Sequence, residues 1–175
     1  FAMDDERLKG LGGGTYWKEL LDRIRDIRSS EKVVYRQVLD LYATSIDYDP
    51  KSNESVRFFK IVQNKLHYAV NMQTAAELIF SRANAEQEFM GLTSFNGAFP
   101  TKKDISIAKN YLNNDELARL NRMVSAFFDL AELKAIEQLP MKMSDWIVEL
   151  DRFTSIYGKG TLTDSGSISH DKALE

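Results

Sequence analysis

The chain has 175 residues, 43% hydrophobic and 28% charged, a composition that predicts one soluble globular domain with a buried core. Its formal net charge of −3 argues against coating of nucleic acid by the domain as a whole, because that function usually needs a basic surface. The absence of cysteine excludes disulfides and thiolate zinc sites and favours a cytoplasmic location. No apolar run approaches the roughly 18 to 20 residues of a membrane span, so we expect no membrane contact.

Residues that break helices are scarce in most of the chain. There are three prolines and nine glycines, and Gly10, Gly12, Gly13 and Gly14 cluster near the start. The rest of the sequence favours helix, and no alternation typical of strands extends beyond a few residues. We predict an all-α fold, a helical bundle of about five to six helices, with residues 15–157 as a single helical domain.

The two ends differ in composition from this domain. Residues 1–14 are charged and then glycine-rich, so we predict a flexible lead-in or linker. The first residue is not methionine and the segment lacks the features of a signal peptide, which suggests a piece of a longer protein. Residues 158–175 form a polar tail leading into a truncated helix, for which Ser169 is a candidate cap.

The first predicted helix is unusually long. Its apolar residues recur at steps of three and four, and only Glu31 interrupts the series. The series is Trp17, Leu20, Ile24, Ile27, Val34, Val38 and Leu41. No glycine, proline or capping box breaks the register at Ser29–Ser30. We therefore expect one helix of about thirty residues, roughly 45 Å long at 1.5 Å per residue.

Caps and spacing mark the elements that follow. A second helix is predicted over 54–70, and Thr74 with Glu77 forms a capping box that opens a short third helix. The segment 84–100 has no clean period. Irregular connections of that length are uncommon unless they are functional or well packed.

The second half of the chain repeats this pattern of caps. Thr101 and Asp104 resemble another capping box, and the apolar spacing predicts a helix that continues to Leu112. A longer helix starts after it and is closed by Pro140. Ser144 is expected to cap the last complete helix.

No arrangement of residues marks a catalytic or metal centre. His67 and His170 are the two histidines, more than 100 positions apart, and His67 is expected to be packed within a helix. The sequences GLGGGT and DYDPKSNE lack the context of a phosphate loop and the ligands of a calcium loop. We predict no catalytic residue, no cofactor and no metal site.

A cluster of basic residues on the first helix has two interpretations. Arg25, Arg28 and Lys32 share one helical face and could grip an anion. Alternatively they pair with acidic neighbours on the same helix, which is the favoured interpretation. Candidates for contact with an anion or partner are Arg25, Arg28, Lys32, Tyr35, Glu77, Lys102 and Lys103.

The apolar stripe of the first helix can be buried in either of two ways. It can pack inside its own chain or against a second copy, with Glu31 as the polar residue of the seam. A helix that projects beyond the globule favours the second arrangement. We therefore predict a homodimer formed through the long helix.

Seven segments, in order and at matching spacing over nearly the whole chain, resemble the virulence-associated RhuM family. They are DDERLKG, RIRDIRSSEKVVYRQVLDLYATSIDYD, TAAELI, MGLTSF, KKDISIAKNYLN, ELARLNRMV and PMKMSDW. The resemblance implies a cytoplasmic protein linked to virulence or mobile elements. It also implies an N-terminal region similar to small DNA-binding domains of phage antirepressors, and a further helix after the last residue. It implies no activity and no catalytic residue.

Three functions remain open at this point. The first is a non-enzymatic helical interaction or dimerisation domain that serves a DNA-binding regulatory N-terminal region. The second is an enzyme or toxin acting on a nucleotide or nucleic acid, with Arg25, Arg28, Tyr35, Glu77 and the segment EFMGLTSFNG at its site. The third is direct nucleic-acid binding through Lys102, Lys103 and Lys109. The absence of a catalytic set favours the first.

Overall fold

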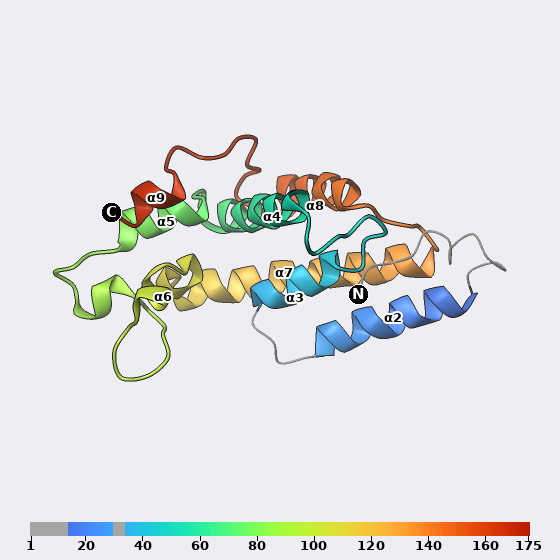
Figure 1. The fold of residues 1–175 in the computed structure, drawn as a ribbon, viewed down its shortest axis with the longest axis horizontal. Helices are drawn as coiled ribbons and strands as arrows, with labels where there is room; N and C mark the ends of the chain where they lie inside the picture. Colours follow the sequence, from blue (N-terminus) through green and yellow to red (C-terminus); the bar gives the residue numbers. More distant parts are fainter. Residues whose placement is uncertain (1–13, 30–33) are drawn as a thin grey trace. The chain divides into compact units, whose positions relative to one another are not determined.

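The computed structural model describes residues 14–29 and 34–175, and every regular element in these ranges is a helix (Figure 1). The elements are α2 (Gly14–Ser29), α3 (Val34–Tyr42), α4 (Asn53–Asn71), α5 (Ala75–Arg82), η2 (Glu88–Gly91), α6 (Lys102–Ile105), η3 (Ala108–Tyr111), α7 (Asn114–Ile136), α8 (Met143–Tyr157) and α9 (His170–Ala173). The all-α prediction is confirmed. The described residues contain more helices than expected, partly because α6 and α9 are single turns.

The chain divides into two compact units. The first comprises residues 1–60 and 121–150, and the second comprises 61–120 and 151–175. The boundaries fall within α4, α7 and α8. The tail beyond Tyr157 belongs to the same unit as residues 151–157. The domain boundary expected at Tyr157 therefore does not coincide with a boundary between the two units. A single domain over 15–157 stays a prediction.

The expected long first helix is two helices, which corrects that prediction. Helix α2 ends at Ser29, and α3 begins at Val34. The Gln37 side chain donates a hydrogen bond to the Ile27 carbonyl at 3.3 Å. Ten residues of a continuous helix would span about 15 Å, so the chain changes direction between these positions. The predicted seam residue Glu31 and residues 1–13 of the linker expected over 1–14 lie outside the described part of the chain. Gly14, the last residue of that predicted linker, begins α2.

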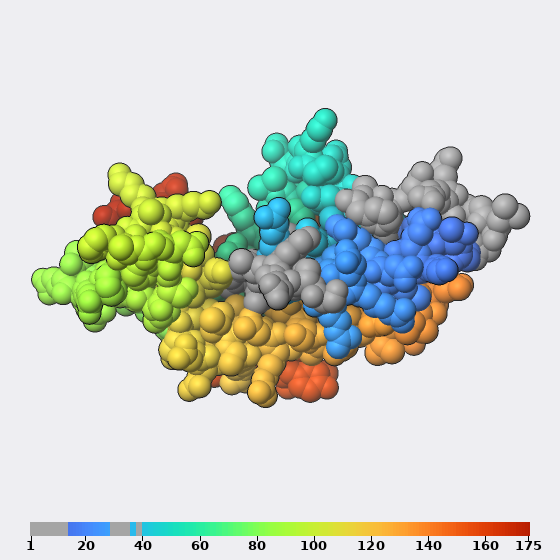
Figure 2. All heavy atoms as spheres, turned by 90° about the horizontal axis from the view of Figure 1, so that it is seen from below, coloured from blue at the N-terminus to red at the C-terminus, as the bar shows by residue number. Residues whose placement is uncertain are grey.

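The apolar face of α2 is buried within its own unit. The side chains of Trp17, Leu20, Ile24 and Ile27 are 6%, 5%, 2% and 1% exposed. Figure 2 shows atoms of α2 (blue) lying against the C-terminal part of α7 and the turn after it (orange). This burial agrees with the intrachain alternative for the face, and the homodimer through the first helix stays a prediction. The prediction that this face is apolar is confirmed, and the face packs against α7 of the same chain.

Aromatic side chains form the centre of the first unit. The buried Tyr42 ring packs edge-on against Phe58, with centroids 4.8 Å apart, and lies 6.2 Å from Trp146. Phe127 of α7 contacts Trp146 from another direction at 6.0 Å. Edge-to-face pairs at these separations are favourable beyond their buried area. This cluster joins α3, α4, α7 and α8 within the unit.

In the second unit a buried lysine anchors the C-terminal segment. Lys65 is 8% exposed, and its Nζ donates to Asp151 Oδ1 and to the Leu162 carbonyl, both at 2.7 Å. Gly158 permits the close approach of the chain here, because a Cβ atom would lie 2.6 Å from the Thr154 carbonyl oxygen. Residues 158–162 are thus held against α4 and α8, and Ser167 farther along is bonded to Glu77 of α5.

Three of the four predicted capping residues cap a helix in the structure. Capping boxes open α5 at Thr74 and α6 at Thr101, and Ser169 caps α9, as expected. Ser144 is not a cap, because α8 begins one residue earlier at Met143. No helix in the two described ranges is long and apolar enough to cross a membrane.

The helix expected from Thr101 to Leu112 is interrupted, which is a second correction. Helix α6 stops at Ile105, and Ile107 is extended before η3 begins. Side chains from η3 satisfy the exposed carbonyls: Asn110 donates to the Asp104 carbonyl and Tyr111 donates to the Ile105 carbonyl. Because these bonds replace helical ones, the break leaves no unpaired backbone at these positions.

Candidate functional site

The predicted arginine cluster is paired with carboxylates of α7. Arg25 Nε lies 2.8 Å from Glu132 Oε1, and Arg28 Nη1 lies 2.5 Å from Asp129 Oδ1 and 3.3 Å from Glu132 Oε2. These partners are more than 100 positions away in sequence, not on the same helix as expected. Both arginine side chains remain about half exposed. The pairing links α2 to α7, and anion binding there stays a prediction.

The other predicted contact residues do not join this cluster. Lys32 and the side chain of Tyr35 lie outside the described residues. Glu77, on α5, and Lys102 and Lys103, on α6, all belong to the second unit. The structure therefore places the arginines and Glu77 in different units, and no described site contains both.

The second unit contains an apolar groove of about 370 Å³. Its walls come from the end of α5, the segment after it, α6 and α9. The lining residues are Phe80, Ala83, Ala85, Met90, Ile105, Lys172, Ala173, Leu174 and Glu175. Phe80 and Leu174 are 53% and 47% exposed, so two large apolar side chains face solvent at one concavity. A volume of this size is typical of pockets that bind small molecules or single side chains.

A bidentate ion pair fixes the helix that carries Phe80. Arg82 donates to both carboxylate oxygens of Glu116 at 2.6 Å and to the Tyr111 carbonyl at 2.9 Å. The pair is partly buried, at 30% and 15% exposure, and the hydrogen bond from Arg82 lowers the pKa of Glu116. Charge-assisted pairs with this geometry are strong and directional. They hold the C-terminal end of α5, one wall of the groove, against η3 and α7.

We expect Glu116→Gln to lower the free energy of unfolding by about 1–3 kcal/mol, because it removes a charged hydrogen-bond acceptor from the partly buried Arg82. Urea denaturation at neutral pH measures this change. The matched control is Asp26→Asn, since Asp26 is an exposed partner of Arg23 at 3.9 Å and should matter by less than about 0.5 kcal/mol. Equal effects for the two variants would contradict the role assigned to the Arg82–Glu116 pair.

The groove wall formed by Met90 has an unusual backbone. Phe89, Met90 and Gly91 have φ angles of 54°, 59° and 80°. For residues with a side chain this left-handed conformation costs about 1–2 kcal/mol each. Gly91 is required at its position, because a Cβ atom there would lie 2.5 Å from the Arg82 carbonyl oxygen. The Asn84 amide closes the turn by donating to the Met90 carbonyl at 3.2 Å.

Glu77 holds the opposite wall of the groove. Its Oε1 accepts hydrogen bonds from the amide and the hydroxyl of Ser167, both at 2.6 Å, and its Oε2 accepts one from the Thr74 amide at 2.8 Å. Burial alone would raise the pKa of Glu77, but the hydrogen bonds from Ser167 and Thr74 lower it to about 2. Three residues after Ser167, α9 begins and packs against α5. Glu77 thus positions the tail, and its contact with an anion or partner stays a prediction.

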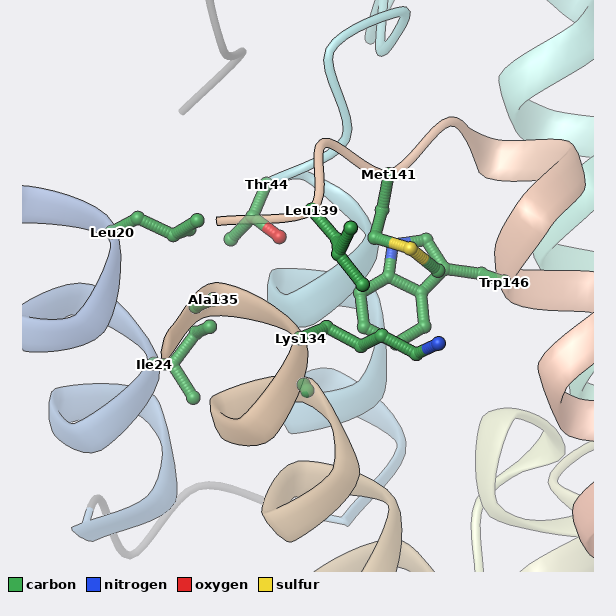
Figure 3. A pocket seen from close by; sticks show the side chains of 9 residues that line it. Leu20, Ile24, Thr44, Lys134, Ala135, Leu139, Met141 and Trp146 are labelled. Atoms are coloured by element: carbon green, nitrogen blue, oxygen red, sulfur yellow. The ribbon is translucent and has the colours of Figure 1, made fainter. Parts of the chain in front are cut away.

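A second cavity, in the first unit, is too small for a ligand. It has a volume of about 10 Å³ and lies where Leu20 and Ile24 of α2 face Ala135 of α7, with Trp146 at its far side (Figure 3). That volume is about the space of one water molecule. The close packing supports burial of the α2 face inside the chain. We take the groove of the second unit, the larger of these two cavities, as the candidate site.

A family model described as Virulence protein RhuM family matches residues 1–175, the whole chain. The chain belongs to the RhuM family. Comparison with curated proteins and with solved structures gives no significant match. Family membership names the relatives of the chain but supplies no substrate or partner.

In this RhuM chain the described histidines and carboxylates are the candidate ligands for a metal site. Among the described residues, no group of three or more His, Cys, Asp or Glu side chains is positioned to hold a metal ion. His67 is fully buried, as expected for a packed histidine. Burial lowers its pKa from 6.5 to about 4, although Glu116 acts in the opposite direction. It is therefore neutral in the folded RhuM chain at neutral pH.

Of the groove residues of the RhuM chain, sequence reasoning selected only Met90, within the segment EFMGLTSFNG, although one further signal was present. Leu78, Ile79 and Phe80 are consecutive, and successive helical residues point about 100° apart, so all three cannot face the same neighbour. The first two are buried and Phe80 is exposed. No such signal marks Lys172 and Leu174 in the sequence. They reach the groove only because the folded tail places α9 against α5.

Proposed function

We propose that this RhuM-family chain is a non-enzymatic interaction domain whose groove in the second unit binds an apolar side chain of a protein partner. The observation that carries the proposal is the exposure of Phe80 and Leu174 at a concave apolar surface of about 370 Å³. Exposed apolar surface that lines a depression is typical of interaction sites.

The backbone of the groove wall supports the proposal. Left-handed non-glycine residues such as Phe89 and Met90 persist only where surrounding contacts enforce them, and they cluster at functional sites. Here the strain places Met90 in the groove, between α5 and α6. The flexible thioether of methionine adapts to differently shaped apolar partners, which suits a binding surface.

The alternative of an enzyme or toxin receives less support. Its proposed residues Arg25 and Arg28 are paired with Asp129 and Glu132, and Glu77 accepts hydrogen bonds from Thr74 and Ser167. The groove itself is lined mainly by apolar side chains. A cytoplasmic location is part of the proposal, and the absence of cysteine from the sequence supports it.

Such a domain would serve a DNA-binding region, if the whole protein carries one, by joining it to a partner or to a second copy. Two weak DNA-binding modules that are held together bind with a raised effective concentration. The remaining alternative is direct nucleic-acid binding through Lys102, Lys103 and Lys109. No observation on these side chains favours it over the role of an interaction domain.

The groove can be tested with 8-anilinonaphthalene-1-sulfonate, a dye that has an apolar ring system and one negative charge. We expect its fluorescence to rise on binding the wild-type chain and to rise much less with Phe80→Ser or Leu174→Ser, because both substitutions remove apolar surface from the groove. Fluorescence titration at low protein concentration measures this difference.

The matched control for the dye experiment is Ile156→Ser. Ile156 is 70% exposed and does not line the groove. The Ile156→Ser variant should therefore bind the dye like the wild type. If Phe80→Ser and Leu174→Ser also bound the dye like the wild type, the groove would not be the binding site.

A further inference from the structure

The described part of the chain carries an exposed side chain that matches the groove. Phe99 is 77% exposed, the highest value among the large exposed hydrophobic residues of the described ranges. It precedes Pro100 in a loop that leads into α6 and extends away from α5 and α9 within the second unit (Figure 1). The φ angle of 89° at Gly97, where a Cβ would meet open space, turns the chain before Phe99.

The loop presents Phe99 on a restricted backbone. A residue before proline is confined to extended conformations, and proline itself has a fixed φ angle. Less conformational entropy is lost when a restricted segment binds, so more of the apolar burial appears as affinity. An exposed phenylalanine in such a segment resembles an anchor residue of a protein interface.

The groove has the size and chemistry for a phenyl ring. An apolar cavity of about 150 Å³ accommodates benzene, and the groove measures about 370 Å³. Met90 offers a thioether, which makes favourable contacts with aromatic rings. The Nζ atom of Lys172 lies 6.0 Å from the centroid of the Phe80 ring. The same ammonium group is available for a cation–π contact with a second aromatic ring that enters the groove.

We infer that the groove of one chain receives Phe99 of a second copy, whose own groove receives Phe99 of the first. The inference rests on the proposed function and names the partner of that same groove. Phe99 is exposed and does not line its own groove, so both halves of the contact are free in each copy. In a twofold dimer each Phe99 fills the groove of the other copy, which gives two equivalent contacts.

Charged side chains lie beside both halves of the contact. Residues 93–101 carry no charge, and the exposed Lys102 and Lys103 follow them. The groove is lined by one carboxylate, Glu175, and one ammonium, Lys172. Lys102 and Lys103 also lie on α6, whose Ile105 lines the groove. The contact between Phe99 and the groove therefore depends on apolar burial and not on charge steering.

Analytical ultracentrifugation of the wild type and variants tests the inference. We expect Phe99→Ser and Leu174→Asp each to raise the dimer dissociation constant at least about tenfold. Ile156→Ser, with a comparably exposed side chain outside the groove, should dimerise like the wild type. A strictly monomeric wild type, or unchanged dimerisation of Phe99→Ser, would overturn the inference.

A mixing experiment separates this dimer from any other. Phe99→Ser keeps an intact groove and Leu174→Asp keeps an intact Phe99, so a mixture of the two should form a heterodimer through one remaining contact. Förster transfer between differently labelled chains measures it, and its absence counts against the inference. A synthetic peptide of residues 93–101 should also displace the anilinonaphthalene dye from the wild type.

The dye and the centrifuge together distinguish two failures. If Phe80→Ser lowers dye binding while Phe99→Ser dimerises normally, the groove is a binding site but its occupant is not Phe99. If Phe80→Ser leaves dye binding unchanged, the proposed function fails as well. Circular dichroism confirms that each variant is folded, which is expected because the substituted side chains are exposed.

Discussion

The free energy of unfolding is expected to fall by about 3 kcal/mol as the pH is lowered from 6.5 to 4, because of His67 alone. The side chain is fully buried, and burial lowers its pKa from 6.5 to about 4. In the unfolded chain the imidazole takes up a proton near pH 6.5, whereas in the folded chain it resists protonation until about pH 4. Between these values the unfolded state binds more protons, so acid favours unfolding.

The variant His67→Gln should lose this pH dependence, because glutamine does not titrate. It will be less stable than the wild type at neutral pH, since it replaces a packed side chain, but its stability should change much less between pH 6.5 and 4. His170→Gln is the control, as His170 is exposed on α9. Urea denaturation at several pH values measures the slopes. An identical slope for His67→Gln and the wild type would show that another group is responsible.

Glu77 contributes in a lower pH window and can be separated from His67. Its pKa lies at about 2 in the folded chain, below its ordinary value of 4.5. Its stabilising hydrogen bonds from Ser167 are therefore fully present above pH 4.5 and are lost as the pH falls toward 2. The loss expected from His67 is largely complete before that range is reached.

Ile24→Ala is expected to lower the free energy of unfolding by about 3 kcal/mol, because it leaves a cavity in a closely packed face. Ile24 is 2% exposed and lines the small cavity beside Ala135 of α7 (Figure 3). The measurement is urea denaturation followed by circular dichroism. This result would show that the apolar face of α2 contributes to the stability of its own chain.

Protein concentration distinguishes this arrangement from a dimer seam. If Ile24 packs inside its own unit, its contribution should not depend on the concentration of the chain. A stabilising dimer contact would instead make the loss grow with concentration, by mass action. Lys18→Ala is the matched control, since Lys18 is an exposed residue of the same helix and should change stability by less than about 0.5 kcal/mol.

The two failures of sequence reasoning about helices have a common cause. The apolar register from Trp17 to Leu41 is continuous, yet α2 and α3 are separate, and Gln37 reaches back to the Ile27 carbonyl. The register from Ile105 to Leu112 is also helical, yet Asn110 and Tyr111 cap the end of α6. In both cases a side chain donates a hydrogen bond to a backbone carbonyl near the end of a helix, and apolar spacing does not indicate such bonds.

The candidate site was predictable only in part. The irregular segment 84–100 was recognised as unusual, and it contains both Met90 and Phe99. Glu77 was selected as a contact residue, which stays a prediction, and the structure shows it bound to Thr74 and Ser167. The groove itself depends on the C-terminal tail packing against α5, and the polar sequence of that tail does not indicate this contact.

The sequence by itself determined the helical class, the family, the capping boxes at Thr74 and Thr101, and the apolar face of α2. Each of these depends on neighbours three or four positions apart, or on the ordered motifs as a whole. Only the tertiary structure decided what each face contacts: α7 for Arg25 and Arg28, and Glu116 for Arg82. The physical reason is that these partners are 34 to 107 residues apart, and only the folded chain brings them within hydrogen-bonding distance.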